Sequence, residues 1–276
     1  MTISIGIVGI KVFMISKKIL IVSRYFSPDR TPESSILKSI SEYLGSKEHR
    51  VDVLSSYPSY GSDRYKSGLK KIEIKNKVKV IRIKLKNEIG QPYIYRVINS
   101  IKLGLKTISL AITNKYDIII ATSNPPVIGP FVASLASFLI NSRFIYYCMD
   151  ITPEVGRING DFKNFFLFNF LQCIDSISCL NANPLIVHSK DMKKTFLKRK
   201  LGNKFKFRIF NNFSLKNSNK STINEKLNVY SDKKKLRVIY AGNIGRFQGL
   251  EIPIFSMSKI RNHEDIELII MGEGVR

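Results

Sequence analysis

Short runs of β-branched and aliphatic residues recur along this chain and alternate with longer stretches in which apolar positions repeat every three or four residues. The runs predict strands at residues 18–23, 51–55, 78–85, 117–122, 144–148, 184–188 and 207–211. The longer stretches predict helices at residues 34–47, 93–114, 127–140, 161–180 and 189–200. Strands that alternate with helices, rather than with tight turns, are typical of an α/β protein.

Most of the predicted strands are apolar throughout, which is the pattern of strands buried on both faces of a parallel sheet. Residues 78–85 alternate apolar and basic side chains instead, so we expect this strand at an edge of the sheet. The pattern therefore predicts a doubly wound parallel sheet, a Rossmann-like domain over residues 17–214.

A polar segment without periodicity, residues 215–235, is typical of a linker. After it come a strand from residue 236, a glycine-rich turn, a helix near residues 249–261 and a further strand to residue 271. One strand–helix–strand unit is too small to close a sheet and core of its own. We therefore expect residues 236–276 to be the start of a second, C-terminally truncated Rossmann-like domain.

The predicted helix at residues 93–114 carries an apolar stripe beside Arg96, Lys102 and Lys106. The stripe consists of positions three and four residues apart, namely Ile94, Val97, Ile98, Ile101, Leu105, Ile108 and Ala111. Packing of this stripe on the protein's own sheet is the favoured interpretation, because every helix of such a fold needs an apolar face. The alternative is that the stripe lies on a membrane surface.

Composition makes this a globular, strongly basic chain. Of 276 residues, 44% are hydrophobic, and 45 Lys and Arg oppose 21 Asp and Glu, giving a net charge of +24. The excess lies in two blocks, residues 64–106 and 190–237. Such blocks attract nucleic acid, an anionic membrane surface or a diphosphate ligand, or form a solvated lysine-rich surface. Nucleic acid is the least favoured partner, because the chain contains no recognised binding motif.

Neither a disulfide framework nor a metal site is predicted. The three cysteines have no C-x-x-C spacing, and the three histidines lie far apart. We expect no metal and no cofactor. No apolar stretch reaches 18 residues, so no membrane-spanning helix is predicted. Residues 1–16 lack the basic start and cleavage site of a signal peptide, and we interpret them as an N-terminal extension.

Two kinds of loop carry candidate chemistry. The turn VIYAGNIGRFQGLE, residues 238–251, joins a strand to a helix, and its glycines let backbone N–H groups approach a phosphate. Its spacing matches no standard phosphate loop, so a ligand-free tight turn stays open. Asp150 and Glu154 follow a strand, where a carboxylate accepts a sugar hydroxyl, acts as a base or caps the next helix. His188 is interpreted as a sheet-end histidine.

Five segments together resemble family 4 glycosyltransferases of the GT-B fold, in particular bacterial N-acetylfucosaminyltransferase-like enzymes of O-antigen, capsule and colanic-acid synthesis. The most specific are ATSNPP and YAGNIG. The resemblance spans residues 20–276 and rests on residues 24–60, 121–138, 146–154, 184–196 and 240–251.

The resemblance implies roles for individual residues. Asp150 and Glu154 match a loop that lines the catalytic cleft. Acceptor-side binding is implied for Tyr25, Ser123 and Asn124. The implied diphosphate-binding residues are Gly242, Asn243, Gly245, Arg246 and Gly249, and the implied nucleoside-proximal residues are Gly272 and Glu273. Two positions depart from the pattern, because Thr152 replaces an aromatic residue of the cleft loop and Gln248 replaces a lysine.

The expected function is retaining, metal-independent transfer of a hexosyl or N-acetylhexosaminyl group from a nucleotide-diphosphate sugar to a lipid-diphosphate-linked acceptor. The enzyme would act at the inner face of the cytoplasmic membrane, with an anionic membrane surface as partner. The family's Glu-x7-Glu motif, which positions the donor sugar, would lie after Arg276. We therefore expect the 276-residue chain itself to be inactive. The alternative function is a non-catalytic remnant that binds acceptor or a partner chain.

Overall fold

The computed structural model describes residues 15–59, 68–86, 94–213, 235–245, 248–260 and 265–272, together with residue 274. The chain divides into two compact units, Met1–Leu215 and Lys216–Arg276.

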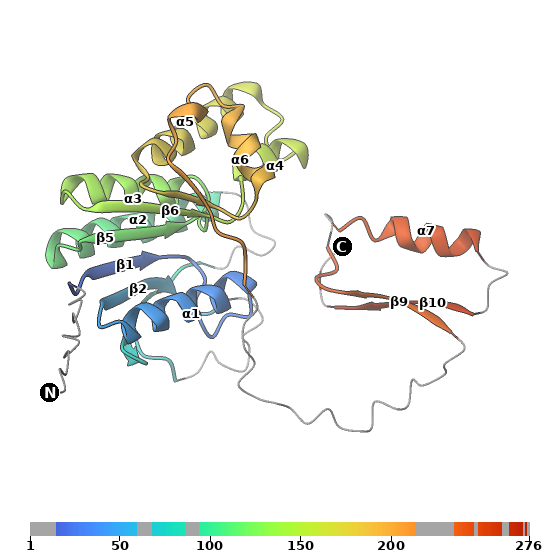
Figure 1. The fold of residues 1–276 in the computed structure, drawn as a ribbon, viewed down its shortest axis with the longest axis horizontal. Coiled ribbons are helices and arrows are strands. Elements are labelled where there is room, and N and C mark those ends of the chain that lie inside the picture. The colour runs from blue at the N-terminus through green and yellow to red at the C-terminus, as the bar shows by residue number, and fades with distance from the viewer. Residues whose placement is uncertain are drawn as a thin grey trace, which may run out of the picture. The chain divides into compact units, whose positions relative to one another are not determined.

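The first unit is built on an eight-stranded sheet with the order β3-β4-β2-β1-β5-β6-β7-β8 (Figure 1). Neighbouring strands pair in parallel, except that β3 runs antiparallel to β4. At the centre, Ile21 of β1 lies opposite Val53 of β2 and Ile120 of β5. The strands span Lys18–Val22 (β1), Arg50–Ser56 (β2), Ile72–Lys75 (β3), Val78–Ile83 (β4), Ile118–Thr122 (β5), Arg143–Cys148 (β6), Leu185–Val187 (β7) and Phe207–Ile209 (β8).

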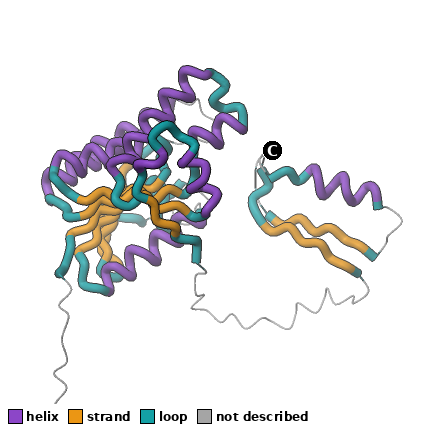
Figure 2. The backbone as a smooth tube through the Cα atoms, turned by 45° about the horizontal axis from the view of Figure 1, so that its top comes forward, coloured by secondary structure: helices purple, strands orange, loops and turns teal. Residues whose placement is uncertain are grey.

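Helices cover the two faces of this sheet unequally. Helices α2, α3 and α5 lie side by side over one face, whereas α1 packs on the other (Figures 1 and 2). The helices span Pro32–Ser46 (α1), Ile94–Asn114 (α2), Ile128–Leu139 (α3), Thr152–Ile158 (α4), Phe165–Asn181 (α5) and Lys190–Leu197 (α6), and a 3₁₀ turn follows at Gly202–Lys204. The doubly wound α/β fold predicted from the sequence is confirmed.

Alternation along the central strands creates two hydrophobic cores. Leu20 and Val22 belong to the core beneath α2, α3 and α5. The intervening residue Ile21 belongs to the core beneath α1, together with Leu37 of that helix. Successive side chains of a strand point to opposite faces, so a strand that is apolar at every position serves both cores.

Two sequence predictions about elements were wrong. Residues 78–85 were expected at an edge, but β3 pairs outside β4 and makes β4 an inner strand. The hairpin turn between them, Asn76 and Lys77, has positive φ at both residues, a conformation that the predicted pattern of helices and parallel strands did not anticipate. The predicted helix at residues 161–180 begins only at Phe165, where Asn164 caps it by accepting the N–H of Leu167. A separate short helix, α4, precedes it.

Helix α2 packs only part of its predicted apolar stripe, Ile108 and Ala111, on the core of the first unit. Its buried residues are small or polar for the most part, namely Asn99, Ser100, Leu103, Gly104, Thr107 and Ala111. Most of the predicted stripe is solvent-exposed, including Ile94, Ile98, Ile101 and Leu105. The small face brings α2 close to α3, where a Cβ on Gly104 would lie 3.0 Å from Val132. Close approach of the two backbones therefore decides the orientation, not the number of apolar side chains.

The second unit consists of β9 (Leu236–Ala241), α7 (Glu251–Lys259) and β10 (Ile266–Met271). The two strands pair in parallel, with Val238 opposite Leu268. Among the residues described in this unit, Leu250 alone is buried.

No helix within the described ranges has both the length and the hydrophobicity needed to cross a bilayer.

Candidate functional site

The direction in which strands are added to the sheet reverses at β1. From β1 the chain continues to β2 and β4 on one side, whereas β5 lies on the other side of β1. In open α/β sheets, ligands bind outside the carboxyl ends of the strands at such a reversal. The loops after β1 and β5 therefore frame the candidate site of the first unit.

The backbone N–H and C=O of Arg24 form hydrogen bonds that hold three strand ends together at this point. The N–H of Arg24 donates to the carbonyl of Asn124, 2.9 Å away, after β5. The carbonyl of Arg24 accepts from the hydroxyls of Ser55 and Ser56, both at 2.8 Å, at the end of β2. The rim of the site is thus fixed by the main chain and by short side chains, before any ligand is considered.

A buried carboxylate, Glu33, lies at the centre of this rim and was not singled out from the sequence. It stands in the first turn of α1 and is 8% exposed. Its oxygens accept hydrogen bonds from the Ser23 hydroxyl at 2.8 Å and from the side-chain amide of Asn124. In the sequence, an acid after Thr31 and Pro32 is typical of the first turn of a helix. That local pattern does not indicate that Glu33 lies between strand ends.

Burial raises the pKa of Glu33 above its usual range. Hydrogen bonds from Thr122, Asn124 and Ser23 offset part of this rise, whereas the negative charge of Asp150 adds to it. The negative charge of Asp150 thus acts on Glu33 in the same direction as burial, although the two residues are far apart in sequence.

The predicted acceptor-side residues Ser123 and Asn124 belong to the same rim. The hydroxyl oxygen of Ser123 accepts the backbone N–H groups of Met149 and Asp150, both at 3.1 Å. Ser123 thereby holds the loop that carries Asp150, whose side chain is exposed. Tyr25, half-buried in the loop after β1, stacks against the Arg24 guanidinium, whose carbon lies 5.3 Å from the ring centroid.

The predicted catalytic residue Glu154 is engaged in a different set of contacts. Its carboxylate forms a bidentate ion pair with Arg199, with both N–O distances 2.7 Å, and accepts from Gln172 at 3.0 Å. Arg199 also pairs with Asp175 at 2.7 Å, and Tyr146 donates to Asp175 at 3.0 Å. This network links α4, α5 and β6 to the turn that follows α6. The contacts of Glu154 support a positioning role for it.

His188 behaves as the sequence predicted. Its Nδ1 lies 3.2 Å from the carbonyl oxygen of Phe210, and its ring packs against the edge of Tyr147 with centroids 5.3 Å apart. These contacts satisfy a histidine at the end of β7.

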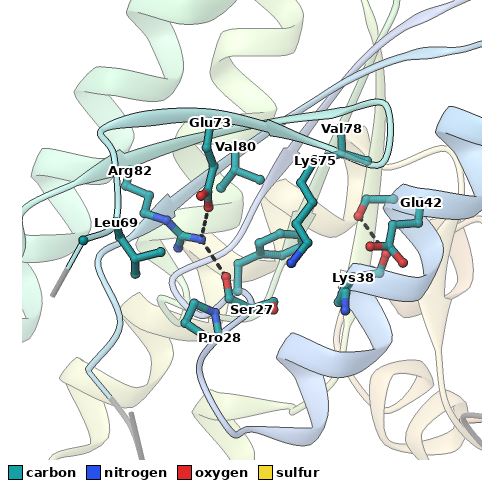
Figure 3. A pocket seen from close by; sticks show the side chains of 13 residues that line it. Ser27, Pro28, Lys38, Glu42, Leu69, Glu73, Lys75, Val78, Val80 and Arg82 are labelled. Atoms are coloured by element: carbon teal, nitrogen blue, oxygen red, sulfur yellow. Dashed lines mark hydrogen bonds and ion pairs between the residues drawn. The ribbon is translucent and has the colours of Figure 1, made fainter. Parts of the chain in front are cut away.

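A cavity of about 360 Å³ lies beside the loop after β1, between α1 and the β3–β4 hairpin (Figure 3). Arg82, which is 1% exposed, closes one side of it. Its guanidinium donates to Glu73 at 2.7 Å and to the carbonyl of Ser27 at 2.6 Å. Arg82 therefore fixes the position of the β1 loop from outside the rim.

The candidate site of the second unit is formed mainly by backbone. Gly242, Asn243 and Gly245 occupy the turn after β9, and Gly249 precedes α7 with a φ of +60°. The hydroxyl of Tyr240 donates to the carbonyl of Asn243 at 2.8 Å and stabilises the turn. The left-handed conformation of Gly249 turns the chain into α7, whose first N–H groups carry the positive end of the helix dipole.

The segment after β10 crosses this turn at very short range. The N–H of Gly242 donates to the carbonyl of Met271 at 2.9 Å. A Cβ on Gly272 would lie 1.7 Å from the carbonyl oxygen of Gly242, and one on Gly274 would lie 1.8 Å from that of Ile244. The structure thus brings Gly272 against Gly242, one of the predicted diphosphate-binding glycines. Arg246 and Glu273, predicted for the same site, lie outside the described residues.

No model of a known protein family and no curated protein matches this chain. Solved structures do resemble it in fold. Sucrose-phosphate synthase from Thermosynechococcus elongatus has a TM-score of 0.63 at 14% identity, over 93% of this chain. The catalytic domain of starch synthase IV from Arabidopsis thaliana, bound to ADP and acarbose, has a TM-score of 0.62 at 11% identity, over 95% of this chain.

A third similar structure is a putative UDP-N-acetylglucosamine 2-epimerase from Listeria monocytogenes, with a TM-score of 0.50 at 12% identity over 93% of this chain. The chain spans 62%, 69% and 62% of the lengths of these three proteins. At such identities the likeness defines the fold alone. The fold is that of the GT-B proteins, with a Rossmann-like first unit and a strand–helix–strand second unit.

Proposed function

We propose that this chain is a glycosyltransferase of the GT-B class, whose second unit binds a nucleotide-diphosphate sugar and whose first unit binds the acceptor. The supporting observation is the turn after β9, where Gly242 and Gly245 present bare main chain and Gly249, with a φ of +60°, leads into the N-terminus of α7. Proteins of similar fold are named for sugar-nucleotide chemistry, and one was solved with ADP.

The proposed chemistry follows from charge. Breaking the bond between sugar and diphosphate places negative charge on the leaving phosphate, and N–H groups fixed around it stabilise that charge more in the transition state than in the ground state. This arrangement meets the electrostatic requirement without a metal ion, so we propose metal-independent transfer. Retention of the sugar's configuration is part of the same proposal.

For the acceptor we propose a lipid-diphosphate-linked saccharide of the surface polysaccharides, as in the family 4 enzymes that build O-antigen, capsule or colanic acid. The acceptor hydroxyl would approach the rim of the first unit, where Asn124 donates to Glu33 and the neighbouring Ser123 accepts the N–H of Asp150. A diphosphate lipid acceptor also requires the enzyme to work at the inner face of the cytoplasmic membrane.

Calorimetric titration with UDP, ADP and GDP, each beside its monophosphate, tests donor binding. We expect at least one diphosphate to bind more tightly than its monophosphate, because the second phosphate meets the turn. The matched variants are Gly245→Ala and Gly245→Glu. The nearest described atoms to a Cβ at this position would be the flexible end of Gln248, at 2.8 Å, and the side-chain amide of Asn243, at 3.3 Å, and both variants meet them equally.

Gly245→Glu should abolish diphosphate binding through charge repulsion, whereas Gly245→Ala should retain most of it. Equal affinities for the two variants would contradict a diphosphate at this turn. Transfer is then tested by incubating the chain with radiolabelled sugar nucleotides and bacterial membrane lipids. Label in the lipid phase supports transfer, an altered free sugar nucleotide supports an epimerase, and binding without turnover supports the non-catalytic alternative.

A further inference from the structure

Three neighbouring helices of the first unit, α2, α3 and α5, bury mainly small or polar residues and expose many large apolar ones. The buried residues of α3 are Gly129, Pro130, Ala133, Ser134, Ala136 and Ser137. The large exposed apolar residues of α2, α3 and α5 are Ile94, Ile98, Ile101, Leu105, Ile112, Leu135, Phe138, Leu139, Phe165, Phe166, Leu167, Phe170 and Ile177. This set is called the outer helix face below. An ordinary surface helix shows the reverse distribution.

Contacts between the helices explain why the small side is inside. Gly104 of α2 packs against Val132 of α3, and Asn181 of α5 donates to the hydroxyl of Ser134 of α3 at 2.9 Å. The hydroxyls of Ser100 and Thr107 donate to carbonyls of their own helix, at 2.7 and 2.9 Å. The polar groups on the inner side are therefore satisfied, and the inverted arrangement leaves no unpaired hydroxyl at these two positions.

The charged residues on these three helices indicate which kind of partner surface would bind them. All three helices are described in full, and their single acid is Asp175, which is 2% exposed and paired with Arg199. Their bases are Arg96, Lys102 and Lys106, all on α2. A second copy docked on the same face would bring bases toward bases. An anionic lipid bilayer, with negatively charged headgroups above its hydrocarbon core, complements both the bases and the apolar residues.

We propose that the outer helix face is a membrane-binding surface, on which α2, α3 and α5 lie flat against an anionic lipid bilayer. Exposed phenylalanine and isoleucine side chains enter the boundary between headgroups and acyl chains, while Lys102 and Lys106 contact lipid phosphates. The inference extends the proposed function, because a lipid-linked acceptor lies in such a bilayer. It does not depend on donor binding, which involves the second unit.

Flotation of the 276-residue chain with vesicles tests this surface. The vesicles contain phosphatidylglycerol and phosphatidylcholine in equal parts, or phosphatidylcholine alone. Leu105→Ser, Phe138→Ser and Phe166→Ser each remove one exposed apolar side chain from the outer helix face. The matched control is Ile74→Ser on β3, because Ile74 is 78% exposed, close to the 79% of Phe138.

We expect the wild type to bind the anionic vesicles, each variant of the outer helix face to bind about tenfold more weakly or worse, and Ile74→Ser to bind normally. Lys102→Glu should weaken binding to anionic vesicles more than to neutral ones. Unchanged vesicle binding by all three apolar variants would overturn the proposal.

A dimer in the wild type, seen by sedimentation without vesicles and dissolved by the same substitutions, would overturn it too, since the face would then bind a second copy. Nucleotide titration of the three variants separates the two proposals. Normal diphosphate binding with lost vesicle binding supports the membrane surface whatever the reaction. Vesicle binding without any diphosphate binding leaves this surface intact and contradicts the proposed donor site.

Discussion

The two units present candidate sites of opposite construction. In the first unit, side chains build the site. Asn124 donates to Glu33, and Ser123 accepts the N–H of Met149 at the strand ends. In the second unit, main chain builds it, and Gly272 passes so close to Gly242 that no side chain fits between them. A side-chain site selects among acceptors by shape and hydrogen bonding, whereas a backbone site suits a feature common to all donors, the diphosphate.

The largest expected effect concerns the side-chain network of the first unit. Arg199→Met leaves the buried Asp175 without its cation and Glu154 without its bidentate partner. Removing one member of a buried ion pair costs about 3–5 kcal/mol, so urea unfolding monitored by circular dichroism should show a loss of this size. Lys200→Met is the control, because Lys200 is an exposed neighbour and its loss should leave the free energy of unfolding nearly unchanged. Equal stability of both variants would mean that the network is dispensable.

A smaller and more local effect is expected from the backbone site. Gly272→Val places a branched side chain on the carbonyl of Gly242, so strands β9 and β10 must move apart. Overpacking of this kind costs about 1–3 kcal/mol, and hydrogen exchange should accelerate at Val238 and Ile269. Amides of β1 and β5 should keep their protection. Ser258→Ala on the exposed side of α7 is the control. Uniform acceleration in both units would show that they do not respond separately.

The smallest expected effect is a pH dependence. The pKa of Glu33 is raised in the folded chain, so the folded state holds this proton more tightly than the unfolded state. The stability that Glu33 contributes is therefore present at low pH and is lost as the pH rises through its folded pKa. Relative to Glu33→Gln, the wild type should lose free energy of unfolding between the ordinary carboxyl pKa and that raised pKa.

A control for this pH dependence has the opposite sign. The hydrogen bond and charge of Lys77, whose amine lies 2.6 Å from Glu48, lower the pKa of that exposed carboxyl. Relative to Glu48→Gln, the wild type should therefore lose stability as the pH falls. The same trend for both pairs would contradict the environment assigned to Glu33.

The strands could be predicted from the sequence because their buried positions follow one another without interruption. The run KILIV, for example, supplies both cores from one strand. Which face of α2 is buried could not be predicted from the sequence. Periodicity shows that a helix has two different faces, but it does not show which of them packs on the sheet. That choice was made by Gly104 and Val132, two residues of different helices.

The candidate sites divide in the same way. The glycine turn was found because it is local, and the close approach of Gly272 to it gives a steric reason for one glycine of the second segment. Glu33 was missed because its partners Ser23, Thr122 and Asn124 lie at the ends of β1 and β5, which only the strand order brings together. Likewise, the pairing of Glu154 with Arg199 joins residues 45 positions apart.

The central claim, that the main chain of the second unit holds a nucleotide diphosphate, is tested most directly by amide chemical shifts during titration with UDP or ADP. We predict that the largest shifts occur at Asn243, Gly245 and Leu250, and that the monophosphates give smaller ones. Amides at the rim of the first unit should move little. Saturable shifts confined to the first unit, or none at any residue with either diphosphate, would contradict the account.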